Sequence, residues 1–184
     1  MEQKLFMVML GCTPSGRHTE QHDIFFGIGT SLKSLLPDMQ AFWPEAEGKI
    51  HIDAWREVTT IEGYRIQVVP KKQVGASKER LFFLNLGGYK PNEFEEYHYK
   101  VLAVAPNKST AIKQAKKTAF YQHCGFKGAE SHIDDQYGVD VDDVHKVEDI
   151  LPTSHKANYR LELIKADGVA EDILHVGYVK VSRL

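Results

Sequence analysis

The residues best suited to chemistry lie near the N-terminus, in the segment HTEQHD at positions 18–23. His18, Glu20 and His22 are spaced two apart, so on a β-strand all three side chains would point to one face. Zinc and iron accept imidazole and carboxylate ligands, and the same groups serve as general acids and bases. The segment could therefore hold a metal ion, perform acid/base chemistry, or only mark the entrance to a strand.

The chain contains a second version of this segment, which tests the first. Residues 4–30 align with residues 80–106 at a constant offset of 76, with six identities in 27 positions, where ordinary composition gives about one or two. Four polar positions have these counterparts: Glu20 and Glu96, His22 and His98, His18 and Phe94, Asp23 and Tyr99. The comparison reduces the motif to Glu-x-His.

A second polar pair follows about thirty residues later, in HIDAWREV at 51–58, and HIDDQYGV at 132–139 resembles it. Each copy thus combines Glu-x-His with His-x-Asp, and if the two strands are neighbours, a histidine lies within reach of a carboxylate. The candidate cluster comprises Glu20, His22, His51 and Asp53 in the first copy and Glu96, His98, His132 and Asp134 in the second.

Two interpretations of the cluster stay open. It could be an acid/base site or a metal site with two histidines and a carboxylate in each copy. It could equally be a histidine–carboxylate hydrogen bond that satisfies polar groups at a strand end. The structural interpretation is favoured, because ion-pair networks are common without function. The sequence therefore predicts neither a metal nor another cofactor.

The elements that position these residues follow the same order in both copies. Apolar runs predict strands at 4–11 and 23–29, a helix at 31–43 that Pro37 should kink or split, and strands at 49–58 and 64–69. In the second copy, residues 109–121 predict an uninterrupted helix, and residues 142–151 a short acidic helix ended by Pro152. Residues 159–164 and 172–181, joined through a turn at Asp167 and Gly168, predict a C-terminal hairpin.

The predicted fold class is α+β, built by internal duplication of a β-β-α-β-β unit. We expect a pseudo-twofold pair with mixed or antiparallel sheets, helices packed on one face and an extra C-terminal hairpin. The predicted domains are a first repeat at 1–70, a linker at 71–79 and a second repeat at 80–184. The second repeat is longer by an insertion at 135–158.

The bulk composition narrows the function classes. A net charge of −2 gives no field that would hold nucleic acid or an anionic membrane, so neither is expected as a partner. Only Cys12 and Cys124 occur, which indicates no disulfide framework and a cytoplasmic protein. The apolar run before Cys12 resembles a lipoprotein signal but is only six residues long, and a similar run recurs inside the chain at 81–86.

The segment from LFMVMLGC to AFWPEA, followed by HIDAWREV, resembles a bacterial family of unknown function, the domain family DUF1543. The resemblance is strong over residues 4–58 and weaker over 80–139. It implies a small protein carrying one or two copies of this unit. It implies no activity and no catalytic residue.

The leading functional hypothesis is a non-enzymatic binding or protein-interaction module, with self-association or a protein partner left open. The first alternative is a small metal-assisted or acid/base enzyme that uses the Glu-x-His and His-x-Asp pairs. The second is an RNA-binding protein that uses the lysines of the second helix, such as Lys108 and Lys113.

Overall fold

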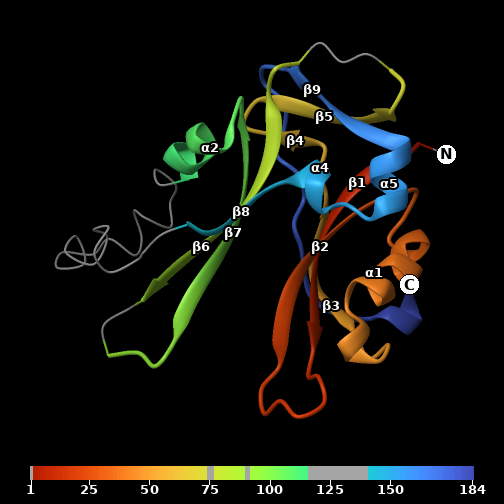
Figure 1. Cartoon of the computed structure of the whole chain (residues 1–184), viewed down its shortest axis with the longest axis vertical. Coiled ribbons are helices and arrows are strands. Elements are labelled where there is room, and N and C mark those ends of the chain that lie inside the picture. The colour runs from red at the N-terminus through yellow and green to blue at the C-terminus, as the bar shows by residue number, and fades with distance from the viewer. Residues whose placement is uncertain (1, 74–76, 90–91, 116–140) are drawn as a thin grey trace. The chain divides into compact units, whose positions relative to one another are not determined.

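The computed structural model describes residues 2–73, 77–89, 92–115 and 141–184 (Figure 1). It shows an α+β fold in which the described strands pair in antiparallel fashion. The chain divides into two units: unit 1 comprises Met1–Ala76 and Ile150–Leu184, and unit 2 comprises Ser77–Asp149. No helix in the described part of the chain is long and apolar enough to cross a lipid bilayer.

Unit 1 is built around a four-stranded sheet with the strand order β10-β3-β1-β2. These strands are β1 (Lys4–Cys12), β2 (Gln21–Gly29), β3 (His51–Glu57) and β10 (His175–Lys180). Between β2 and β3 the chain forms η1 (Lys33–Leu35), α1 (Leu36–Phe42) and η2 (Pro44–Ala46). A second sheet in this unit contains β4 (Thr60–Ile61), β5 (Tyr64–Pro70) and β9 (Tyr159–Lys165), and α5 (Thr153–Asn158) precedes β9.

One face of the four-stranded sheet forms the main core of unit 1. Alternate residues of β1 point to this face, and they pack with one side chain of β2, one of β3 and two of the short helices between them. The members with at most 1% exposure are Phe6, Val8, Leu10, Cys12, Phe25, Ile52, Leu35 and Met39. The opposite face of β1 is therefore the one that carries Gly11.

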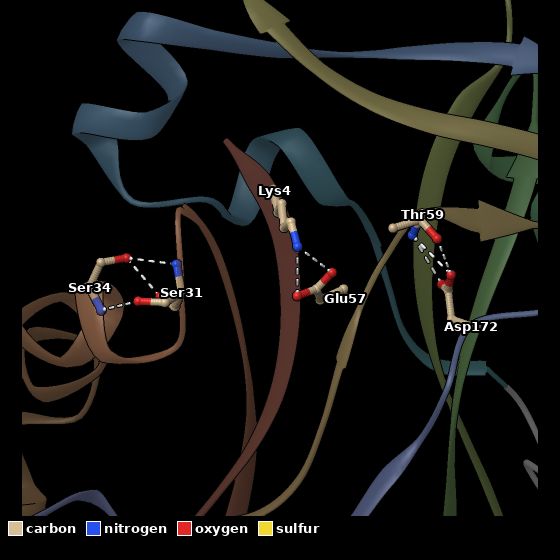
Figure 2. Close-up of polar contacts among 6 residues, drawn as sticks. All are labelled: Lys4, Ser31, Ser34, Glu57, Thr59 and Asp172. Carbon is tan, nitrogen blue, oxygen red and sulfur yellow. Dashed lines mark hydrogen bonds and ion pairs between the residues drawn. The ribbon is translucent and has the colours of Figure 1, made fainter. Parts of the chain in front are cut away.

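The helical segment of unit 1 is divided as its proline predicts. Pro37 lies in the first turn of α1, where its missing N–H costs no hydrogen bond, and the preceding turn is a separate 3₁₀ helix. Ser31 and Ser34 close that turn reciprocally, since each hydroxyl accepts the backbone N–H of the other residue at 3.2 Å (Figure 2). The Ser31 hydroxyl thus satisfies a backbone N–H at the start of this helical segment.

The C-terminal residues do not form the predicted hairpin. β9 pairs with β5, while β10 pairs with β3 in the other sheet of unit 1. The expected assignment of these residues to the second repeat is therefore wrong as well, because Ile150–Leu184 belongs to unit 1. The alternating apolar pattern identified both strands, but each one pairs with a strand roughly a hundred residues earlier, which no local turn signal encodes.

A buried carboxylate fastens the chain between β9 and β10 to the end of β3. Asp172, whose side chain is 2% exposed, lies 2.9 Å from Arg56 Nη2 and accepts hydrogen bonds from the backbone N–H of Thr59 and of Thr60. It also accepts one from the Thr59 hydroxyl (Figure 2). A second ion pair, between Lys4 and Glu57, joins β1 to β3 at 2.9 Å (Figure 2).

Unit 2 contains a three-stranded sheet with the order β7-β6-β8. Its described elements are β6 (Arg80–Tyr89), β7 (Glu96–Ala105), α2 (Lys108–Ala115), β8 (Val141–Lys146) and α4 (Val147–Ile150), whose last residue falls in unit 1. Ala111 and Ala115 of α2 pack on alternate residues of β6, including Leu84 and Leu86. Residues 116–121 of the predicted second helix lie outside the described residues.

The first half of the predicted acidic helix at 142–151 is a strand. Val141–Lys146 pairs with β6, and only Val147–Ile150 is helical. The segment VDDVHK places Val141 and Val144 as its half-buried residues, and this pattern fits the sheet once the register shift within β8 is included.

The two hairpins share one register. β1 and β2 pair Lys4 with Gly29, and β6 and β7 pair Arg80 with Ala105, so both positions are displaced by 76. This similarity agrees with the offset found in the sequence. The duplication itself and its pseudo-twofold relation stay predictions.

Candidate metal-binding site

Three strands of unit 1 bring the first candidate cluster together at Gly11 of β1. Gly11 pairs with His22 on β2 and with His51 on β3. Residues paired across an antiparallel sheet direct their side chains to the same face. The two imidazoles therefore flank a residue without a side chain, on the sheet face opposite the helices.

A β-bulge in β3 positions the third side chain of the cluster, that of Asp53. The register between β1 and β3 shifts between Met9 and Leu10, so Asp53 has no partner on β1. Such a bulge re-aims a side chain that regular pleating would have placed elsewhere. Asp53 Oδ2 lies 3.2 Å from His51 Nε2 and 3.3 Å from His22 Nε2, so the carboxylate reaches both rings.

Glu20, the residue just before β2, completes the cluster. Its Oε1 lies 3.0 Å from His51 Nε2, and its Oε2 lies 3.6 Å from His22 Nε2. The structure thus brings together all four residues that the sequence proposed for the first copy. Each imidazole is close to two carboxylates, and each carboxylate is close to two imidazoles.

Gly11 is what allows this approach. A Cβ atom at this position would overlap both Asp53 Oδ2 and His51 Nε2. The two side chains therefore occupy the space that any other residue at position 11 would fill. The glycine shared by the two copies at positions 11 and 87 marks a close approach of side chains to the backbone.

The cluster has a buried base and an open rim. His51 is 9% exposed, whereas the side chains of His22 and Glu20 are 39% and 45% exposed. His51 Nε2 and Asp53 Oδ2 are both inaccessible to solvent, and neither has a hydrogen-bond partner within the described residues. Buried polar atoms are usually satisfied, so two such atoms side by side require an explanation.

The C-terminal strand supports the buried histidine. β10 lies beside β3, and the Tyr178 ring stands 4.6 Å from the His51 ring. Four residues further along β3, Trp55 stacks on His175 of β10, with ring centroids 3.8 Å apart and planes 5° from parallel. Nothing in the sequence identified Tyr178, because the pairing of β10 with β3 was not predicted.

The free thiol of unit 1 does not join the cluster. Cys12 is buried on the opposite, helix-covered face of the sheet. Burial raises the pKa of this thiol, so the thiolate that a soft metal prefers is disfavoured there. Cys124 lies outside the described residues.

Unit 2 retains part of the arrangement. Gly87 of β6 pairs with His98 of β7, and His98 Nε2 lies 3.9 Å from Glu96 Oε2. His132 and Asp134, which the sequence assigned to the third strand of this copy, lie outside the described residues. The strand that pairs with β6 is β8, and its Asp142 Oδ2 lies 3.4 Å from His98 Nε2.

Sequence reasoning missed Asp142 because letter identity favoured a different segment. HIDDQYGV shares three consecutive letters with HIDAWREV, whereas VDDVHK shares almost none. The valines at 141 and 144 could have indicated a bulged strand and so pointed to Asp142, because the exposed positions of such a strand accept any polar residue.

A separate polar pair in unit 1 lines an open pocket of about 360 Å³ between β2 and α5. His155 Nδ1 accepts the backbone N–H of Ile28 at 3.1 Å, and Nε2 faces Asp38 Oδ2 at 3.5 Å. Ser154 also lines the pocket, but both nitrogens of the ring are already engaged. No nitrogen is left to activate the serine, so the trio does not form a nucleophilic triad.

Comparison with known proteins adds a family and a fold. Residues 17–68 match the model of the family described as Domain of Unknown Function (DUF1543), and all four residues of the first cluster fall within that range. Protein Il1583 from Idiomarina loihiensis, known from a crystal structure, is 25% identical over 96% of each chain with a TM-score of 0.62. No curated protein matches the chain significantly. The family model therefore identifies residues 17–68 as a segment of the DUF1543 type.

Proposed function

We propose that unit 1 binds one divalent transition-metal ion of the zinc type through Glu20, His22, His51 and Asp53. The observation that carries the proposal is the pair of buried, unpartnered ligand atoms, His51 Nε2 and Asp53 Oδ2, at the centre of the cluster. A metal ion between them would satisfy both atoms at once.

The spacing of the four groups supports this proposal quantitatively. With metal–ligand bonds of about 2.0–2.2 Å, the corners of a tetrahedron lie roughly 3.3–3.6 Å apart. The four nitrogen–oxygen separations in the cluster run from 3.0 to 3.6 Å. The separations at His51 Nε2 are short enough for hydrogen bonds, yet none of these contacts has hydrogen-bond geometry.

The ligand types and charges indicate which ion. Two imidazoles favour zinc, iron, nickel or copper over magnesium and calcium, which prefer oxygen ligands alone. Two carboxylates balance the charge of a divalent ion when both imidazoles are neutral. The thiol of Cys12 lies on the other face of the sheet, which removes the softest ligand from the set.

Four protein ligands also favour binding over catalysis. A catalytic zinc usually keeps one position open for water, whereas a closed set of four is typical of a structural or storage site. The proposal therefore specifies the leading hypothesis of a binding module. It departs from the sequence-based preference for a metal-free hydrogen-bond pair, because that pair would leave no buried atom unpartnered.

The test is calorimetric titration of metal-free protein with Zn²⁺, using His22→Ala and Asp53→Asn as the site variants. His18→Ala is the matched control, since His18 lies four residues from His22 in the same segment and outside the cluster. We expect tight uptake of one ion at this site by the wild type and the control. Each site variant should weaken binding at least about 100-fold, because a ligand is lost.

Two results would contradict the proposal: no Zn²⁺ uptake by folded wild-type protein, or an equal loss of affinity in His18→Ala. Substitution with Co²⁺ gives an independent readout, since a four-coordinate cobalt site absorbs visible light strongly. Thermal unfolding gives another, because an ion at 100 times its dissociation constant stabilises the native state by about 2.7 kcal/mol.

A further inference from the structure

We infer that unit 2 carries a second cation site, formed by Glu96, His98 and Asp142, which is weaker than the site of unit 1 and richer in oxygen. One ligand atom from each of the three residues lies within 4.8 Å of the other two. The inference shares its ligand chemistry with the proposed function but none of its residues, so either can fail alone.

The backbone of unit 2 positions these groups by the same devices that unit 1 uses. Gly87 pairs with His98, and the register between β6 and β8 shifts between Asn85 and Leu86, which places Asp142 at the bulge. A Cβ atom at Gly87 would overlap the Asp142 carboxylate. A glycine and a bulge thus again let a carboxylate cross the central strand to meet a histidine.

The second cluster differs from the first in ways that lower its affinity. Among the described residues it holds one imidazole. β8 begins at Val141, opposite Leu86, so no described residue of β8 stands opposite Gly87 as His51 stands opposite Gly11. Its nitrogen–oxygen separations are 3.4 and 3.9 Å, against 3.0–3.6 Å in unit 1. Its side chains are 30–42% exposed, so bound water would complete the coordination of an ion.

The neighbouring row of the sheet also distinguishes the two units. Asn85 pairs with Lys100 and with Asp143, on the same face as Gly87, whereas the matching row of unit 1 is Met9, Ile24 and Ala54. The Lys100 ammonium donates to the His98 carbonyl at 3.2 Å, which brings a positive charge close to the cluster. That charge should repel a cation, so Lys100 is expected to weaken the second site.

One imidazole with two carboxylates suits manganese as well as zinc. The probe is therefore Mn²⁺ alone, with free Mn²⁺ followed by electron paramagnetic resonance in a titration of the full chain. The first site is disabled by His22→Ala with Asp53→Asn, so that uptake reports unit 2 only. Into this background we place Asp142→Asn or His98→Ala, with Asp143→Asn on the same strand as the control.

We expect the background protein to take up one Mn²⁺, and Asp142→Asn or His98→Ala to weaken that uptake at least ten-fold. Asp143→Asn removes a negative charge but no ligand, so it should weaken uptake less than either ligand variant does. Lys100→Met should tighten it several-fold, a result that a purely structural ion-pair cluster would not give. Asp142→Asn retains the shape of the side chain, and circular dichroism of each variant confirms that it is folded.

The inference is overturned if the background protein takes up no Mn²⁺, or if Asp142→Asn and His98→Ala bind it as the background does. Failure of the proposed function appears elsewhere, as equal Zn²⁺ binding by the wild type and the background protein. Uptake that disappears only in Asp142→Asn and His98→Ala would support the second site even then.

Discussion

Gly11 is the residue on which the first cluster depends most, although it contributes no side chain. His51 and Asp53 lie over its Cα, in the volume that a Cβ atom would need. The ligands of the proposed site therefore come from β2, β3 and the residue before β2, while the central strand β1 contributes only open space. A site built on paired strands is more rigid than one built on loops.

Gly11→Ala should accordingly weaken Zn²⁺ binding without removing any ligand. The added methyl group must displace the His51 ring or the Asp53 carboxylate, and a displaced ligand costs roughly ten-fold or more in affinity. Calorimetric titration measures the change. Gly87→Ala is the matched control, because it places the same methyl group beside Asp142 in the other unit. Equal loss of Zn²⁺ affinity in both variants would contradict the role assigned to Gly11.

His155 gives unit 1 a dependence on pH that is separate from the metal site. Burial lowers the pKa of His155 below its usual value, and the nearby Asp38 opposes this effect only in part. The neutral ring fits its surroundings, because Nδ1 accepts the N–H of Ile28 and could not do so if protonated. The unfolded chain therefore binds a proton more readily than the folded chain does.

It follows that the stabilisation from neutral His155 is fully present above the unfolded pKa of about 6.5. It is lost as the pH falls from there through the lowered folded pKa. Urea unfolding between pH 7.5 and 5.5 tests this sign. His155→Asn, which keeps an acceptor and cannot be protonated, should lose less stability over that range than the wild type. Parallel curves for the two proteins would contradict the prediction.

The segment between β9 and β10 is the element whose attachment matters most to the site. It carries the chain from one sheet of unit 1 to the other, and β10 then holds Tyr178 against the His51 ring. Its contact with the end of β3 is made by Asp172, which is almost fully buried and accepts hydrogen bonds from the backbone. The proposed metal site of unit 1 is therefore supported by residues more than a hundred positions away.

Asp172→Asn should destabilise unit 1 by on the order of 3 kcal/mol, since it leaves the Arg56 guanidinium without its buried partner. It should also increase amide exchange in β10. Urea unfolding and hydrogen exchange measure the two effects. Asp167→Asn, at the exposed turn after β9, is the control and should change stability by less than about 0.5 kcal/mol. A loss of similar size in both variants would contradict the role of Asp172.

At the scale of elements, the sequence predicted what depends on local signals. The apolar runs identified β1, β2 and β3, Pro37 identified the division of the first helical segment, and the two-residue spacing of His51 and Asp53 identified one wall of the cluster. The C-terminal hairpin and the acidic helix were wrong because the pairings of β8, β9 and β10 are long-range. Such pairings depend on which partner strands are available, and periodicity does not encode that.

The candidate site shows the same division. All four residues of the first cluster could be found, because the internal copy removed the positions that were not shared. Asp142 and Tyr178 could not be found, because a bulge brings the first into place and a distant strand brings the second. The buried, unpartnered state of His51 and Asp53 is also invisible in sequence, and it is what changes the favoured interpretation from a hydrogen bond to a metal site.

Each of the two units has a hydrophobic cluster among its described residues, and each of these clusters lies under one of the two proposed cation sites. In unit 1 the helices cover the sheet face opposite Gly11, and in unit 2 α2 covers the face that includes Leu84 and Leu86. Each site is therefore built on its own sheet and core. This arrangement predicts that damage to one core leaves the other site largely intact.

Leu84→Ala tests this independence. Leu84 is fully buried, and its truncation should cost about 2–5 kcal/mol within unit 2. Amide exchange should rise in β6 and β7, while exchange in β1 and the Zn²⁺ affinity of the first site change less than two-fold. Val8→Ala, at the equivalent position on β1, should give the reverse pattern. Equal loss of protection in both sheets would mean that the units unfold as one, and each proposed site would then depend on both cores.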